Sequence, residues 1–228
     1  MKIARIGSVA LALLSASAVS VAAQDTQTFQ FLNGYVTPPG VMAGNAYVGP
    51  YTAEVLSLPG QPIIDLFCVD FNHDATLGLA WTGILETTDG SLSLTRQAGA
   101  GLPAAQVQQT YLEAAYLAGL FSSTPTSSWG DIAFAIWHIT SGVPITESGE
   151  AYYVGQAQSF WTTVDPSAWQ VITDVAAWSC SGGACTYNTD AGTQEFLTQV
   201  TPEPGTILLL GTGLVGVMLG GVVKRALA

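Results

Sequence analysis

The sequence predicts an α+β fold in which strands come first, a group of helices is inserted, and one strand closes the domain. Three observations support this order. From position 28 to 94, apolar and polar residues alternate in short runs separated by turn sequences. From position 102 the apolar residues recur with the helical period, and alternation returns from 193 to 200. We therefore expect a β-sheet or barrel with a helical insertion, forming a single extracellular domain over residues 24–200.

Five runs in the first part fit the strand pattern, with turns rich in proline and glycine between them. The runs are Phe29 with Phe31, Tyr47 to Leu56, Ile63 to Asp70, Ala80 to Leu85, and Ser91 to Leu94. The turns are Pro38-Pro39-Gly40, Leu58-Pro59-Gly60 and Thr88-Asp89-Gly90. A last strand is expected over 193–200.

Three helices are expected between these strands. The first begins at Pro103, which suits a first helical residue, and ends near Gly119. The second covers about 131–141, and its apolar residues lie on all sides, so we expect it to be buried. The third covers about 149–162, and Asp165-Pro166 then begins a short fourth helix or turn.

The C-terminal residues 201–228 combine three features in a fixed order. Pro202-Glu203-Pro204 precedes an uncharged apolar stretch, 206–223, which is followed by Lys224 and Arg225. Eighteen residues at a helical rise of about 1.5 Å reach about 27 Å, enough for a transmembrane helix. The prolines favour an extended segment outside the membrane, and the two cations favour the cytoplasmic side as a membrane stop.

These features resemble the PEP-CTERM sorting signal of Gram-negative bacteria, also labelled the ice-binding protein C-terminal domain. The resemblance implies recognition by an exosortase, a membrane transpeptidase-like protease. It also implies cleavage at or near Pro202, Glu203 and Pro204, with transfer to the cell surface or the extracellular space. The basic cluster is shorter than usual. The alternative is an ordinary C-terminal membrane anchor, which does not need the Pro-Glu-Pro lead.

The N-terminal residues 1–23 have the pattern of a secretory signal peptide. Lys2 and Arg5 precede an apolar run, 6–14, and small residues follow up to Ala23. We expect cleavage after Ala23, so the mature chain begins at Gln24. The precursor is then anchored in the inner membrane by its C-terminal helix until the exosortase acts.

The charge of the mature region is strongly negative. All sixteen acidic residues lie between Asp25 and Glu203, where Arg96 is the one basic residue, so the net charge is −15. Such a surface repels nucleic acids and anionic lipids, which excludes nucleic-acid partners. It favours solubility outside the cell, and it could attract divalent cations or cationic matrix material.

Three cysteines in an exported chain indicate one disulfide and one remaining thiol. Cys180 and Cys185 flank a short flexible loop, Ser181-Gly182-Gly183-Ala184, so we expect a local bridge across a hairpin-like turn. Cys68 is then the odd cysteine, and we expect it to be buried as a small apolar residue.

The segment Phe67-Cys68-Val69-Asp70, together with Ala135-Ile136-Trp137, resembles thioester adhesin domains. In that family a cysteine and a glutamine condense into an internal thioester that captures nucleophiles. The glutamine position, one turn before Trp137, is Ala133 here. The resemblance therefore implies the family's architecture without the bond, with Cys68 as a packed thiol beside Trp137.

Two further patterns bear on cofactors and catalysis. Asp70, Asn72 and Asp74 open a sequence like a calcium loop, and Asp65 could join them. The sixth and twelfth positions of that loop are Ala75 and Trp81 instead of the required glycine and glutamate. No cofactor is expected, with calcium as the alternative.

The two histidines, His73 and His138, lack the spacing of zinc ligands. Cys68 with His138 is the one nucleophile–base pair that the residues allow. We expect His138 to be a core residue and not a catalytic base. These observations together predict a non-enzymatic cell-surface or matrix protein of biofilms, associated with polysaccharide or with matrix proteins through adhesion. The alternatives are a thioester- or calcium-dependent adhesin and, after them, a cysteine hydrolase.

Overall fold

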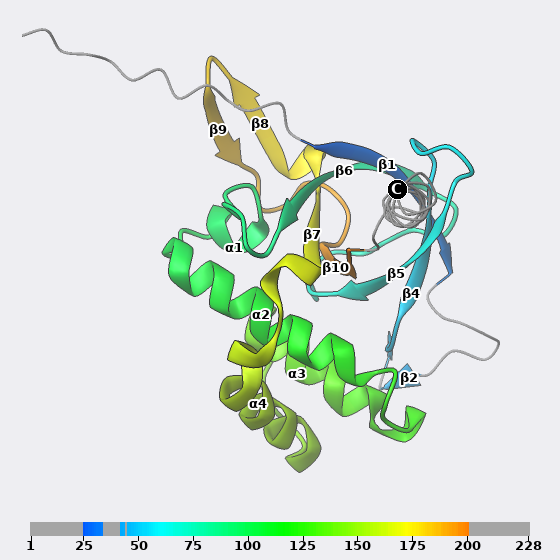
Figure 1. Ribbon diagram of the computed structural model, residues 1–228, viewed down its shortest axis with the longest axis vertical. Coiled ribbons are helices and arrows are strands. Elements are labelled where there is room, and N and C mark those ends of the chain that lie inside the picture. Colours follow the sequence, from blue (N-terminus) through cyan, green and yellow to red (C-terminus); the bar gives the residue numbers. More distant parts are fainter. Residues whose placement is uncertain (1–24, 34–41, 44, 201–228) are drawn as a thin grey trace, which may run out of the picture.

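The computed structural model describes residues 25–33, 42–43 and 45–200 (Figure 1). The predicted signal peptide, the Pro-Glu-Pro motif, the apolar stretch 206–223, and Lys224 with Arg225 all lie outside these residues. Among the helices that are described, none combines the length and the apolar composition needed to cross a membrane.

Six strands form a closed antiparallel barrel in the order β1-β4-β5-β10-β7-β6, and β6 pairs back onto β1. Their bounds are β1 (Thr26–Asn33), β4 (Tyr51–Val55), β5 (Ile63–Cys68), β6 (Ala80–Thr87), β7 (Trp169–Asp174) and β10 (Phe196–Gln199). A short pair, β2 (Met42–Ala43) and β3 (Ala46–Tyr47), lies outside the barrel. The prediction of barrel-like early strands joined by a last strand is therefore confirmed.

Aromatic rings fill the barrel. Phe196 is fully buried, and its ring centroid lies 6.1 Å from Phe31 and 6.0 Å from Trp81. Strands β6 and β7 approach closely at Gly83, where a Cβ atom would lie 2.5 Å from Ile172. Glycine is therefore required at this position so that the barrel can close around its aromatic core.

The helices are inserted between β6 and β7 and gather on one side of the barrel (Figure 1). They are α1 (Arg96–Gly99), α2 (Ala104–Leu120), α3 (Trp129–Ser141) and α4 (Ser148–Phe160), with short 3₁₀ turns at Thr126–Ser128, Trp161–Thr163 and Pro166–Ala168. A further 3₁₀ turn, Val175–Ala177, follows β7. Phe67 of β5 stacks on Phe121 at the end of α2, with ring centroids 5.8 Å apart. The helical insertion thus packs its apolar residues against the outside of the barrel.

The helix predictions hold with small shifts at the ends. Pro103 caps α2 instead of being its first residue, and α2 continues through Gly119 to Leu120. Gly142 caps α3 in the left-handed conformation, with φ at 69°, and its N–H donates to the His138 carbonyl at 3.1 Å. Asp165 caps the turn that begins at Pro166, because its side chain accepts from the Ser167 N–H.

The predicted strand over 91–94 is wrong. This segment is a turn in which Leu92 has a φ of 46°. The Glu86 carboxylate accepts the N–H groups of Ser93 at 3.0 Å and Leu94 at 2.9 Å. A side chain therefore takes the backbone donors that a neighbouring strand would need.

Two strands beyond the prediction form a hairpin around the cysteines. β8 (Trp178–Ser181) pairs with β9 (Ala184–Tyr187), and Cys180 lies directly opposite Cys185. The loop glycines, Gly182 and Gly183, both have positive φ, at 62° and 84°, as a two-residue hairpin turn requires. The predicted disulfide between Cys180 and Cys185 is confirmed.

Candidate functional site

The end of β5 places the remaining thiol beside an indole. Cys68 is 5% exposed, and its Sγ accepts a hydrogen bond from Trp137 Nε1 at 3.3 Å. The thiol in turn lies 3.3 Å from the Asp70 carbonyl, to which it donates. The structure thus brings together the two residues that the thioester resemblance singles out, one from β5 and one from α3.

The space around this thiol is small. A cavity of about 10 Å³ is lined by Gly49, Tyr51, Cys68, Phe121, Ala133, Ile136 and Trp137. It has room for at most about one water molecule. Ala133 is 4% exposed and presents only a methyl group where the resembling family has its glutamine. Burial raises the pKa of Cys68 to about 12, so the thiol stays protonated and is a poor nucleophile.

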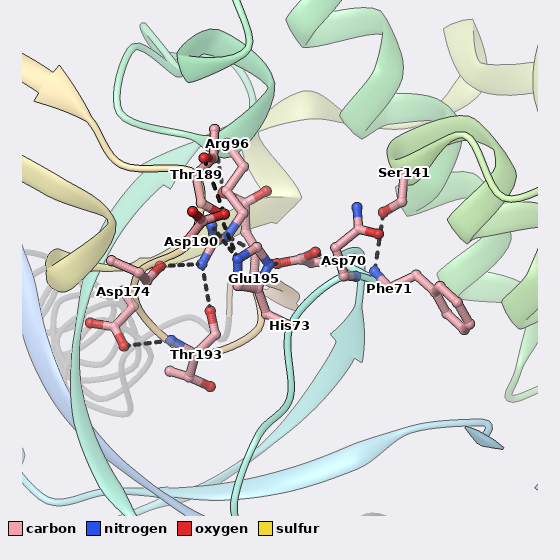
Figure 2. A network of polar contacts seen from close by, with 12 residues as sticks. Asp70, Phe71, His73, Arg96, Ser141, Asp174, Thr189, Asp190, Thr193 and Glu195 are labelled. Carbon is pink, nitrogen blue, oxygen red and sulfur yellow. Dashed lines mark hydrogen bonds and ion pairs between the residues drawn. The ribbon is translucent and has the colours of Figure 1, made fainter. Parts of the chain in front are cut away.

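Two residues beyond Cys68, the chain enters a buried charged network, drawn in Figure 2. Arg96 of α1 is 6% exposed, and its Nε lies 2.9 Å from Asp70 Oδ2. Its terminal nitrogen donates to the carbonyls of Ala191 at 2.9 Å and Thr193 at 2.8 Å. Arg96 therefore joins β5 and α1 to the loop before β10, and its charge is compensated by Asp70.

His73 is held by the same carboxylate. Its Nδ1 lies 2.7 Å from Asp70 Oδ2, and its Nε2 lies 2.8 Å from the Thr189 carbonyl. Because a backbone carbonyl occupies the second nitrogen, no hydroxyl or thiol nucleophile among the described residues is bonded to this Asp–His pair. The pair therefore lacks the third member of a catalytic triad.

The same contacts bear on the calcium alternative. Asp70 Oδ2 contacts Arg96 and His73, and its Oδ1 accepts from the Asn72 N–H at 3.0 Å. Asn72 and Asp74 are exposed. Across the part of the chain that the structure describes, no group of three or more His, Cys, Asp or Glu side chains is placed to hold a metal. A cation at Asp70 would have to compete with Arg96 for the same oxygen.

Glu195 forms the other half of the network. It is 1% exposed and accepts from the Arg96 N–H at 2.7 Å, the Thr173 hydroxyl at 2.6 Å and the Tyr111 hydroxyl. Burial raises the pKa of Glu195 to about 7, and the hydrogen bonds and Arg96 oppose this rise only in part. The carboxyl thus titrates near neutral pH inside the protein.

A surface pocket of about 400 Å³ lies against this network. Its outer wall includes Asn72, Gln97, Ser141, Tyr187, Thr189 and Asp190. The charged groups at its base are already bonded to one another, so they fix the surrounding loops and leave few polar atoms for a ligand. We interpret this network as a structural tie between the barrel, α1 and the loop 188–195.

The alternative nucleophile pair is not assembled. His138 Nδ1 lies 2.7 Å from the Val143 carbonyl, and His138 lines a different pocket from Cys68, between α2, α3 and α4. Cys68 instead bonds Trp137 and the Asp70 carbonyl. The roles of Arg96 and Glu195 were not predicted from the sequence. A signal was present, because a region of net charge −15 keeps a single basic residue.

Comparison with known proteins identifies the C-terminal segment. Residues 200–225 match the family model of the PEP-CTERM protein-sorting motif, so the chain carries this sorting signal. The match includes Pro202-Glu203-Pro204, the apolar stretch and the two basic residues. No curated protein and no solved structure matched the chain.

Proposed function

We propose that this chain, which carries a PEP-CTERM signal and is therefore an exported exosortase target, is a non-enzymatic protein of the cell surface or extracellular matrix. The sorting motif at residues 200–225 is the observation that carries the proposal. In this proposal the apolar stretch 206–223 holds the precursor in the inner membrane. The exosortase then cleaves at or near Pro202, Glu203 and Pro204, and the domain remains outside the cell.

A non-enzymatic role is supported by the state of the reactive groups. The Cys68 thiol is buried with a pKa of about 12, and the resembling family's glutamine is replaced by Ala133. The Asp70–His73 pair is bonded to Arg96 and to a backbone carbonyl. These groups are engaged with one another, so we assign the domain a role in non-covalent contacts with polysaccharide or matrix proteins.

The alternatives differ in what they require of Cys68. A thioester-dependent adhesin needs a covalent bond at this sulfur, and a cysteine hydrolase needs a thiolate with His138 as its base. A calcium-dependent adhesin needs Asp70 to be released from Arg96. Each requirement conflicts with a contact described above, which is why we favour the non-covalent role.

The sorting part of the proposal is tested by replacing Pro202, Glu203 and Pro204 with alanine in the producing cell. We expect the protein to accumulate as an unprocessed membrane-bound precursor and to disappear from the cell surface. A matched control is Pro59→Ala, which removes an exposed proline in the β4–β5 turn. Unchanged surface display of the triple variant would contradict the proposal.

A further inference from the structure

One face of α2 carries polar residues at helical spacing. Gln106, Gln109, Thr110 and Glu113 stand at positions i, i+3, i+4 and i+7, so their side chains lie on the same face. A groove of about 380 Å³ lies where this face meets α3 and α4; Thr110 and Glu113 are buried there, whereas Gln106 and Gln109 are exposed to solvent. The groove is lined by Gln106, Gln109, Thr110, Glu113, His138, Ile139 and Gln158.

The groove contains a buried acid with a free oxygen. Glu113 is 7% exposed, and its Oε1 accepts from Gln109 Nε2 at 2.8 Å. Its Oε2 makes no hydrogen bond to another described residue. The contrast with Glu195 is clear, since that carboxylate accepts from three donors of the protein. This oxygen reaches the solvent-filled groove, so it can accept a hydrogen bond from water or from a ligand bound there.

Other polar atoms in the groove also lack a hydrogen-bond partner among the described residues. His138 uses Nδ1 for the Val143 carbonyl, and among the described residues its Nε2 has no partner. The side-chain amides of Gln106 and Gln158 also make no hydrogen bonds within the described part of the chain, and both residues are exposed. The groove therefore offers several donors and acceptors that the fold itself does not use.

The chemistry of these groups selects the ligand. Ile139 is the one apolar residue of the lining, so an apolar ligand would gain little from burial there. Glu113 is its one carboxylate and no Lys or Arg lines it, so an anionic ligand is repelled. Amide groups donate and accept at once, as sugar hydroxyls do, and a volume of 380 Å³ falls in the range of small-ligand pockets.

We propose that the groove between α2, α3 and α4 binds a neutral sugar unit of a polysaccharide, with Glu113 Oε2 accepting a sugar hydroxyl. Gln106 and Gln158 bond further hydroxyls from the two sides of the groove. This inference rests on the proposed function, because it names the site through which the exported domain contacts polysaccharide.

Two other ligand classes fit less well. A metal ion would find only Glu113 and His138 as ligands in the groove, and the described residues contain no cluster of three. A lysine or amine ligand could pair with Glu113, but it would leave the glutamine amides without partners. A hydroxyl-rich neutral ligand uses both the carboxylate and the amides.

The test is affinity electrophoresis of the full-length protein, kept soluble in a mild detergent, through gels that contain dextran, chitosan or alginate. These polymers are neutral, cationic and anionic. The variants are Glu113→Gln and Gln158→Ala, and thermal unfolding confirms that each is folded. Matched controls are Asp89→Asn, which removes an exposed carboxylate, and Gln108→Ala, which changes a glutamine of α2 that bonds Thr88 instead of lining the groove.

We expect retention by dextran, and a dissociation constant about tenfold to a hundredfold larger for Glu113→Gln because a hydrogen bond to a charged group is weakened. Gln158→Ala weakens binding as well, while both controls bind like the wild type. Retention by dextran that both groove variants leave unchanged would overturn this site and keep the proposed function. Retention only by chitosan would overturn the neutral-sugar assignment. Retention by none of the polymers would count against the polysaccharide contact itself.

Discussion

The carboxyl of Glu195 makes the stability of the domain depend on pH in an unusual direction. It is buried beside Arg96 and Tyr111, and burial raises its pKa from 4.5 to about 7. The folded protein therefore holds this proton more tightly than the unfolded chain does. Its contribution to stability is full below pH 4.5 and is lost as the pH rises through 7. At about 1.4 kcal/mol per pKa unit, the loss is about 3 kcal/mol.

The substitution Glu195→Gln isolates this effect, because an amide has the shape of the protonated carboxyl and does not titrate. We expect the variant and the wild type to have similar free energies of unfolding at pH 5. At pH 8 the variant is expected to be more stable by about 3 kcal/mol. Glu86, whose pKa burial also raises, is present in both proteins, so its contribution cancels in the comparison.

The assay is urea unfolding followed by tryptophan fluorescence at several pH values between 5 and 8, with Asp89→Asn as an exposed control. The control should follow the wild type at every pH. A Glu195→Gln protein that is less stable than the wild type at pH 8 would refute the reasoning. It would mean that the donors of Arg96, Thr173 and Tyr111 outweigh the cost of burying the carboxylate.

Two further predictions concern the neighbouring groups. Cys68 should resist iodoacetamide in the folded protein and react as a single thiol after unfolding, because it is buried with a pKa of about 12. Intact mass measures the alkylation, and rapid alkylation of the folded protein would contradict this prediction. Arg96→Met should lower the free energy of unfolding by about 3–5 kcal/mol, because Asp70 loses its buried partner. Adding Asp70→Asn to this variant should recover part of that loss. The measurement is urea unfolding. If Arg96→Met lowered the free energy of unfolding by less than about 1 kcal/mol, the buried ion pair would contribute no more than an exposed one.

The order of strands and helices was predictable because the apolar period is local information. The αL cap at Gly142 and the turn at Asp165-Pro166 also follow from single residues. The strand predicted at 91–94 failed because its backbone donors bond Glu86, a contact that depends on where β6 ends. β7 was missed because its residues do not alternate: Val171, Ile172 and Thr173 follow one another and all three are buried.

The candidate site was likewise predictable only in part. The positions of Cys68 and Trp137 followed from a motif resemblance, and the structure places their side chains in contact. The partners of Arg96 come from the segment that follows β5 and from the loop 188–195, which are far apart in sequence. No local pattern specifies such a meeting, so only the excess of acidic residues over one arginine hinted at it.

The intact mass of the protein recovered from its native cells, before and after denaturation and alkylation, tests the central claim most directly. We expect a chain from Gln24 to near Pro204, two hydrogens lighter than the reduced form, with one thiol that reacts only after unfolding. A chain that still ends at Ala228 would contradict exosortase processing. A mass lower by one further ammonia, localised to Cys68, would contradict the non-covalent role and indicate a thioester.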